Sequence, residues 1–195
     1  MVNIAIFASG NGSNAEEIIK YFKDDNDVKV ALILSNKSDA YVLHRAKKYG
    51  IDTIVFNRQQ LKEGEVLEDL KKYKIDFIIL AGFLWLIPTH LVVAYPNRII
   101  NIHPALLPRH GGKGMYGEKV HQAVLASGDR ETGITIHYVN EHYDKGNVIF
   151  QARCDISPED TADSIASKVH VLEYEHFPKI IDKVIKSEDR ATEDL

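Results

Sequence analysis

The chain has 195 residues, of which 45% are hydrophobic and 27% charged, and its formal net charge at pH 7 is −4. This length and composition suffice for one domain with a substantial hydrophobic core, and they exclude a strongly basic nucleic-acid binder. The only cysteine, Cys154, cannot form an internal disulfide, and no apolar run is long enough to span a membrane. We therefore expect a cytoplasmic protein without nucleic-acid or membrane partners.

Short, β-branched apolar segments alternate with amphipathic helical patterns along the first half of the chain. Strands are predicted at residues 3–9, 28–35, 53–56, 75–81 and 98–103, with helical patterns between the first four. Several of these strands are apolar on both faces, which is typical of a sheet covered by helices on both sides. The pattern predicts an α/β fold with an open, mostly parallel, twisted sheet.

The pattern changes beyond Gly128. Two strand-like runs, 133–139 and 147–154, predict an antiparallel pair that extends the sheet in the C-terminal third. A long helix is predicted at 161–186. We expect residues 1–186 to form a single domain and the charged residues 187–195 to form a frayed tail.

The first predicted strand ends in a glycine-rich turn, SGNGSN, at residues 9–14. Such a turn at a helix N-terminus presents free backbone N–H groups, which favour a phosphate. The candidate phosphate-binding residues are Gly10, Asn11, Gly12, Ser13 and Asn14. The same residues also fit an ordinary strand-to-helix turn, with Ser13 or Asn14 as the N-cap of a helix at 15–22.

A dinucleotide site is a competing interpretation of this turn. Ala15 stands where the third glycine of the dinucleotide fingerprint belongs, and the second strand ends in Ser35 and Asn36 rather than an acidic residue. A nucleoside triphosphate is disfavoured because the chain lacks a G-x-x-x-x-G-K-[ST] motif. A single phosphate fits the loop better.

Polar side chains end the predicted strand at 98–103. Asn101 and His103 are two residues apart and so share one face, while Ile102 faces the core. An amide and an imidazole, with a carboxylate such as Asp144 near the imidazole, can stabilise and protonate a tetrahedral intermediate of acyl transfer. The apolar run at 80–88 also ends a strand, and it predicts either a pocket for a flat heterocycle or ordinary core.

Taken in order, these motifs resemble the phosphoribosylglycinamide formyltransferase family. The resemblance rests on residues 9–14, Ser35-Asn36-Lys37, Ala81-Gly82-Phe83, Asn101-Ile102-His103-Pro104 with Leu106-Leu107-Pro108, and Asp144 in an Asp-x-Gly turn. It implies a Rossmann-like formyltransferase fold. It further implies transfer of a formyl group from 10-formyltetrahydrofolate, as co-substrate, to the amine of 5-phosphoribosylglycinamide in de novo purine (IMP) biosynthesis.

The resemblance also implies roles for individual residues. Asn101, His103 and Asp144 would be catalytic, with Asn101 on the oxyanion, also beside the folate, and His103 held as an imidazolium by Asp144. The glycine-rich turn would hold the substrate phosphate. The folate pterin would lie against Leu84, Trp85, Leu86 and Ile87.

Three further expectations concern substrate contacts. Glu173, on the last predicted helix, corresponds to a substrate-binding position of the family. Either Arg58 or Lys62 could meet the acidic tail of the folate. Compared with the family pattern, a glycine-rich segment is inserted at 110–117, in which the stretch Gly111–Gly117 predicts a mobile lid over the substrate.

Several alternatives stay open at this point. Formyltransferases that act on a sugar nucleotide or on methionyl-tRNA share the Asn-x-His-Pro and Asp motifs, and formyltetrahydrofolate hydrolases share the catalytic trio, although both the tRNA enzymes and the hydrolases usually carry an additional domain. A nucleotide sensor or NAD-dependent oxidoreductase would keep only the glycine loop. The scattered histidines do not have the spacing of a metal site, so we expect no metal. We expect small-molecule substrates as partners and a monomer or homodimer.

Overall fold

The computed structural model describes residues 1–193, with side chains described through Glu188. The strands are β1 (Val2–Phe7), β2 (Val28–Ser35), β3 (Asp52–Val55), β4 (Phe77–Leu80), β5 (Ile99–His103), β6 (Glu131–Tyr138) and β7 (Val148–Asp155). The helices are α1 (Ser13–Phe22), α2 (Tyr41–Lys48), α3 (Arg58–Glu63), α4 (Glu65–Lys72), α5 (Thr89–Ala94), α6 (Glu118–Ala126) and α7 (Ala162–Glu193).

All seven strands join one sheet in the order β3-β2-β1-β4-β5-β6-β7. The first five strands pair in parallel, and β6 and β7 add an antiparallel edge. The predicted fold class, an open and mostly parallel sheet with an antiparallel extension, is therefore confirmed.

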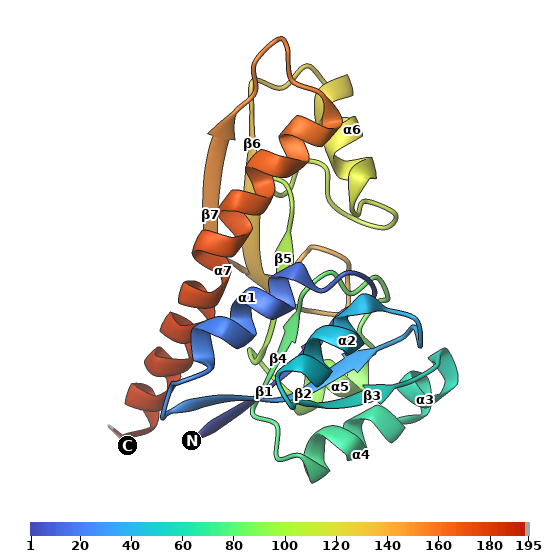
Figure 1. Ribbon diagram of the computed structural model, residues 1–195, viewed down its shortest axis with the longest axis vertical. Helices are drawn as coiled ribbons and strands as arrows, with labels where there is room; N and C mark the ends of the chain where they lie inside the picture. Colours follow the sequence, from blue (N-terminus) through green and yellow to red (C-terminus); the bar gives the residue numbers. More distant parts are fainter. Residues whose placement is uncertain (194–195) are drawn as a thin grey trace.

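Helices cover both faces of the parallel part of the sheet (Figure 1). One core lies under α1, α2 and α7, where Ile18, Val42 and Phe177 are fully buried. The other lies under α3, α4 and α5, where Leu70 and Leu91 are fully buried. Residues of β1 contribute to both cores, as expected for a central strand that is apolar on both faces.

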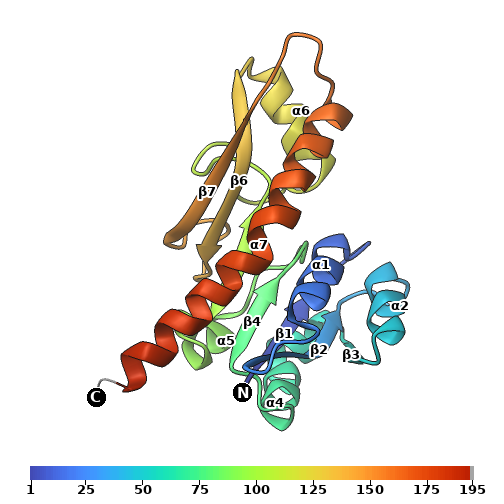
Figure 2. The same cartoon turned by 60° about the vertical axis from the view of Figure 1, so that its left-hand side comes forward.

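Helix α7 connects the two ends of the molecule. It starts beside α6 and the β6–β7 hairpin, passes α1 and continues toward the end of the molecule where the N-terminus lies (Figures 1 and 2). Because α7 packs against α1, α6, β6 and β7, it links the parallel part of the sheet to its antiparallel edge.

The chain reverses its direction of travel across the sheet between β1 and β4. Strand β2 lies on one side of β1 and β4 lies on the other, so the loop after β1 sits at a topological switch point. In open α/β sheets, crevices at such points bind ligands. The glycine-rich loop at residues 9–14 occupies this position.

Element boundaries differ from the predictions in two places. Between β3 and β4, Gly64 adopts φ 93° and divides the helical segment into α3 and α4, because a left-handed residue ends one helix before the next begins. The last helix continues to Glu193 and not to residue 186, so the tail expected at 187–195 is helical as far as the structure describes it. Residues 194–195 lie outside the described residues.

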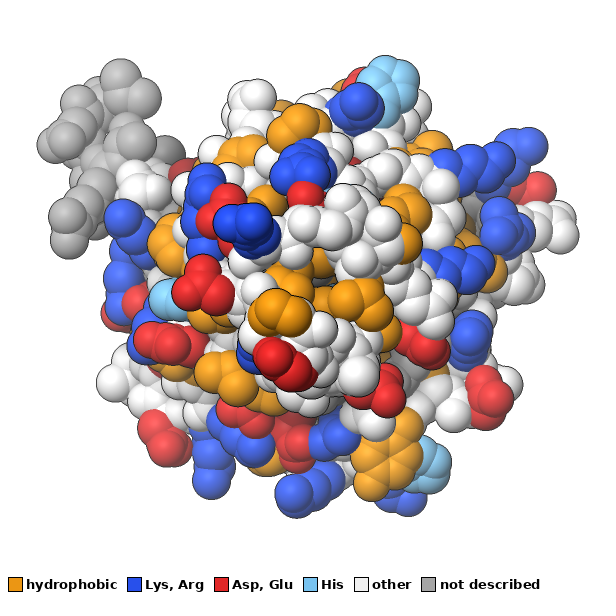
Figure 3. All heavy atoms as spheres, turned by 90° about the horizontal axis from the view of Figure 1, so that it is seen from above, with side chains coloured by type: hydrophobic (Ala, Val, Ile, Leu, Met, Phe, Trp, Pro, Cys, Tyr) orange, Lys and Arg blue, Asp and Glu red, His pale blue; other side chains and the backbone are white. Residues whose placement is uncertain are grey.

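The surface at the α6 end, viewed from above in Figure 3, mixes acidic and basic side chains, with apolar groups scattered among them. No single sign of charge dominates this face. Among residues 1–193, no helix combines the length and apolar character required to cross a membrane.

Candidate active site

A cavity of about 980 Å³ opens at the carboxyl ends of β1, β4 and β5. Its wall is formed by the glycine-rich loop, the segment after β4, the end of β5, the loop before α6, the β6–β7 turn and one side of α7. Parallel strands bring their carboxyl ends to one edge of the sheet, which is why segments so distant in the sequence meet here.

The end of β5 and the β6–β7 turn bring Asn101, His103 and Asp144 to this cavity. Nδ1 of His103 lies 3.6 Å from Oδ2 of Asp144. The carboxylate is held in place by the backbone N–H of Gly112, which donates to Oδ2 at 2.8 Å. The structure therefore brings the three residues together, while their catalytic roles stay predictions.

The sequence predicts an imidazolium at His103, whereas its burial in this structure favours the neutral ring. Only 3% of His103 is exposed, and burial lowers the pKa of its imidazole below 6.5, although Asp144 and the backbone carbonyl of His110 act in the opposite direction. Removing the ring from water disfavours its charged form by more than these neighbours favour it. Burial therefore favours the neutral form of His103.

The tautomer of His103 follows from its hydrogen bond. Nε2 lies 2.8 Å from the carbonyl oxygen of His110, and because a carbonyl can only accept, Nε2 carries the hydrogen. Nδ1 then carries the lone pair and can accept a proton. A proton gained there would face the carboxylate of Asp144.

Asp144 is ionised at neutral pH. Burial pushes the pKa of its carboxyl upward, but His137, His103 and the Gly112 N–H together outweigh burial and hold that pKa below 3.8. A buried negative charge at this place stabilises any positive charge that forms on His103.

His137 orients Asn101, a role that sequence analysis missed. Nδ1 of His137 donates to the carbonyl of Tyr138 at 2.8 Å, and Nε2 lies 3.0 Å from Nδ2 of Asn101 and 3.6 Å from Oδ1 of Asp144. The second N–H of that carboxamide stays available to a ligand. The signal for this contact was the alternation along the 133–139 run, but only the antiparallel register reveals that His137 lies opposite Asn101.

The glycine-rich loop leads directly into α1. Gly12, with φ 75°, is the N-cap residue, and no side chain caps the helix, so the expectation that Ser13 or Asn14 is the N-cap is wrong. Both residues lie within the first turn of the helix. The loop from Gly10 to Asn14 lines the cavity and leaves the N-terminal end of α1 facing it.

Glu173 lies next to this loop. It is 5% exposed, and its Oε2 accepts from Nδ2 of Asn14 at 2.9 Å and from Nδ1 of His170 at 2.9 Å. The carboxylate is therefore a buried wall of the cavity and not a solvated surface group, and it connects α7 to the glycine loop.

The segment expected to bind the pterin lines the cavity from Leu84 to Ile87. Its members differ in exposure, since Leu86 is 40% exposed whereas Ile87 is 2% exposed and packs into the core under α5. The segment is fixed at its start, where the N–H of Leu84 donates to Oγ of Ser9 at 3.1 Å.

Of the two cations considered for an acidic tail, Arg58 lines the cavity and Lys62 is absent from its wall. The Arg58 guanidinium lies 4.6 Å from the centroid of the Trp85 ring. A carboxylate entering beside Trp85 would meet this cation first.

The segment at 110–117 contributes residues from Gly112 to Gly117 to the cavity wall. Gly112, Gly114 and Gly117 all have positive φ, which glycine adopts without strain. The segment therefore borders the space where a substrate would lie.

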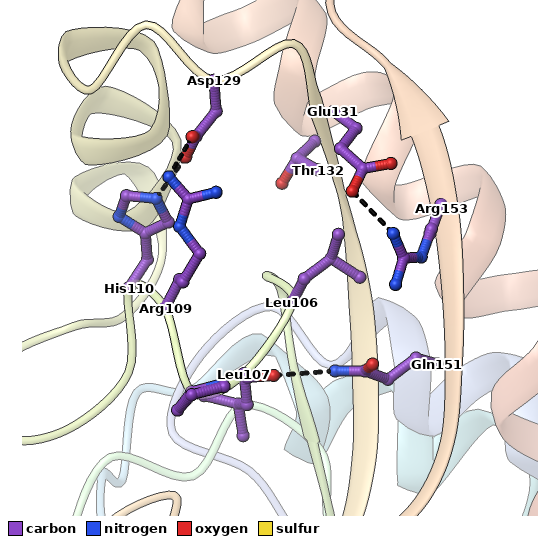
Figure 4. A pocket seen from close by; sticks show the side chains of 10 residues that line it. Leu106, Leu107, Arg109, His110, Asp129, Glu131, Thr132, Gln151 and Arg153 are labelled. Atoms are coloured by element: carbon purple, nitrogen blue, oxygen red, sulfur yellow. Dashed lines mark hydrogen bonds and ion pairs between the residues drawn. The ribbon is translucent and has the colours of Figure 1, made fainter.

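A second, smaller cavity of about 170 Å³ lies behind the segment 106–110, against β6 and β7 (Figure 4). Its arginines are paired with carboxylates, Arg109 with Asp129 and Arg153 with Glu131. Asp129 also accepts from Nε2 of His110 at 2.7 Å. These charges are paired with one another, so neither arginine offers an unpaired charge to a ligand in this cavity.

Comparison with known proteins finds that the chain is similar to formyltransferases. A family model described as formyl transferase matches residues 2–181. The chain is 40% identical to the chloroplastic phosphoribosylglycinamide formyltransferase of Arabidopsis thaliana, covering 98% of this chain and 68% of the relative. It is 35% identical to the phosphoribosylglycinamide formyltransferase of Bacillus subtilis, covering 98% of each.

Solved structures agree. The phosphoribosylglycinamide formyltransferase of Bacillus halodurans superposes with a TM-score of 0.86 at 35% identity, over 94% of this chain and 95% of that one. The glycinamide ribonucleotide transformylase 1 of Geobacillus kaustophilus superposes with a TM-score of 0.84 at 35% identity, over 93% of this chain and 97% of that one.

Proposed function

The chain belongs to the formyl transferase family, and we propose that it transfers a formyl group from 10-formyltetrahydrofolate to the amine of 5-phosphoribosylglycinamide, a step of purine biosynthesis. The observation that carries this proposal is the single cavity lined both by the glycine loop and by Asn101, His103 and Asp144. An anion-binding helix end and an acyl-transfer constellation in one cavity suit a phosphorylated amine acceptor.

Asn101 supports the reaction at the formyl oxygen. The substrate amine attacks the formyl carbon, and negative charge develops on the oxygen. The free N–H of the Asn101 carboxamide, whose other N–H is engaged by His137, donates to that oxygen. Because His137 holds the carboxamide, no reorientation is needed when the charge forms.

His103 moves the proton. In the neutral form favoured by burial, it accepts a proton from the attacking amine and then passes it to the leaving nitrogen of the folate. The ionised carboxylate of Asp144, 3.6 Å away, stabilises the transient imidazolium. In this assignment His103 carries the additional proton only transiently, whereas the sequence predicts that it is an imidazolium throughout.

The remaining walls bind the two substrates. The N-terminal end of α1 and the loop from Gly10 to Asn14 hold the acceptor phosphate, and Glu173 lies beside them toward the rest of the acceptor. Residues Leu84–Ile87 take the pterin ring, and Arg58 takes the acidic tail of the folate.

We further propose that the segment 110–117 closes over bound substrate. Its glycines permit several backbone conformations, and its present position borders the cavity. Amide exchange in this segment should be fast in the free enzyme and slower with both substrates bound. Slow exchange that ligands leave unchanged would contradict closure.

Turnover with different acceptors tests the proposed function. We expect folate product to form with 5-phosphoribosylglycinamide and not with glycinamide lacking the phosphoribose. Folate release without any acceptor would indicate a hydrolase, and turnover only with an amino-sugar nucleotide would indicate the alternative acceptor. The proposal retains the cytoplasmic location and the monomer or homodimer expected from the sequence, which fractionation and sedimentation test.

A further inference from the structure

We propose that Arg45, on α2, is a positioning residue that holds the glycine loop in its phosphate-binding shape. This inference rests on the proposed function, since it assigns the support of the loop that would bind the acceptor phosphate. Arg45 itself does not line the cavity, whereas Asn11, which it contacts, does. Any effect of Arg45 on substrate must therefore pass through the loop.

The guanidinium of Arg45 binds the loop and the first turn of α1 at once. Nε donates to the carbonyl of Asn11 at 2.9 Å, and Nη2 donates to Oδ1 of the same residue at 2.6 Å. Nη1 forms an ion pair with Oε2 of Glu16. The guanidinium thus uses all three nitrogens in one planar arrangement, and it lies 5.0 Å from the centroid of the Tyr41 ring.

The loop depends on α2 at two other points. The N–H of Val42 donates to the carbonyl of Gly10 at 3.1 Å. A Cβ on Gly12 would lie 2.4 Å from Cγ2 of Val42, so the loop packs directly against the helix. Between these two glycines, Asn11 is held on the α2 side only by Arg45 among the described residues.

Helix α1 has no side-chain cap, which increases the importance of contacts such as those of Arg45. An N-cap side chain normally bonds to a first-turn N–H and fixes the entering chain, but α1 begins at Gly12 without one. The first-turn N–H groups are consequently left for a ligand, and the entering chain must be fixed from outside. Arg45, which does not line the cavity, supplies one such restraint through its bonds to Asn11.

Arg45 could act through its positive charge alone and not through its planar set of hydrogen-bond donors. A comparison with Lys48 distinguishes these two explanations. Lys48 lies on the same helix and places Nζ 3.6 Å from Oε1 of Glu16, but its side chain is 69% exposed. Lys48→Gln removes one positive charge near the same carboxylate. Arg45→Lys keeps the charge but cannot reproduce the planar set of donors.

The experiment measures kcat and KM for formyl transfer with Arg45→Lys, Arg45→Gln and Lys48→Gln. We expect both Arg45 variants to raise KM for 5-phosphoribosylglycinamide about tenfold, with kcat and the KM for the folate within about twofold of wild type. Lys48→Gln should leave all three quantities unchanged. Circular dichroism checks that each variant is folded.

Three results would overturn the inference. Wild-type KM in Arg45→Lys would show that only charge matters. A loss of kcat at constant KM would place Arg45 in the chemical step. Failure of both Arg45 variants to fold would make Arg45 a residue of general stability. By contrast, if wild-type enzyme used phosphorylated and unphosphorylated acceptors equally well, the proposed phosphate site itself would fail, whatever Arg45 does.

Discussion

The imidazole of His103 and the carboxylate of Asp144 lie side by side in the cavity, with 3.6 Å between Nδ1 and Oδ2. Burial lowers the pKa of the ring and favours its neutral form, whereas neighbouring groups lower the pKa of the carboxyl and favour its ionised form. A neutral base beside a fixed negative charge can accept a proton and hold it briefly. This relationship determines how the reaction should respond to pH.

Activity should decline toward acidic pH. If His103 must be neutral to accept a proton, kcat/KM falls as pH drops through a pKa below 6.5. Asp144 raises the His103 pKa, so Asp144→Asn should move this acidic limb to still lower pH while reducing the maximal rate. A rate that instead falls as pH rises above 6.5 would restore His103 to the role of an imidazolium.

His137 should matter through Asn101. His137→Phe keeps a ring of similar size but removes the acceptor, so the Asn101 carboxamide loses its fixed orientation. We expect kcat to fall about 10- to 100-fold with little change in either KM. His137→Gln, which retains an acceptor, serves as the partial rescue. Equal kcat in wild type and His137→Phe would show that Asn101 needs no such support.

Two glycines of the same loop should differ sharply in their tolerance of a side chain. Gly12 has φ 75° and its added Cβ would collide with Val42, whereas nothing lies within 4 Å of a Cβ on Gly10. Gly12→Ala should lower the free energy of unfolding by at least about 2 kcal/mol. Gly10→Ala should change it by less than about 1 kcal/mol. Chemical denaturation of the two variants makes the comparison, and equal stabilities would contradict the packing described.

His121 should make stability depend on pH. It is 3% exposed, and burial lowers its pKa below 6.5, with a smaller effect of the same sign from His170. The unfolded chain therefore binds a proton that the folded chain resists, so the free energy of unfolding should fall as pH drops through 6.5 toward the folded pKa.

His121→Leu should flatten that pH dependence. His44→Gln, which removes an exposed histidine, is the matched control. The pKa of His170, raised by Glu173, contributes with the opposite sign, and that of His103, lowered by burial, contributes with the same sign as His121; both rings are present in all three proteins. A slope unchanged in His121→Leu would show that this ring is not the titrating group.

The fold was largely predictable because it follows from periodicity. Apolar runs such as 77–81 predict strands, and the helix-length patterns between these runs predict that the strands are parallel. Two features were missed. Gly64 ends α3 as a left-handed residue, a signal that hydrophobic periodicity does not carry, and the charged residues after 186 continue α7 to Glu193 although their composition indicated a tail.

The sequence predicted which residues meet in the candidate site better than it predicted their protonation states and hydrogen-bond partners. Asn101 and His103 stand out because they share a face at the end of a strand. The protonation state of His103 depends on burial and on the nearby His110 carbonyl, neither of which a linear sequence reveals. His137 and Arg45 were missed for the same reason, because their partners lie on other elements of the fold.

The most direct test of the account compares formyl transfer by wild type, Asn101→Ala and His103→Ala with 5-phosphoribosylglycinamide as acceptor. Loss of one oxyanion donor typically slows acyl transfer about 100- to 1,000-fold, and we expect kcat to fall at least that far in each variant with the fold intact. Activity within a few-fold of wild type in either variant would contradict the assignment of this cavity as the site of formyl transfer.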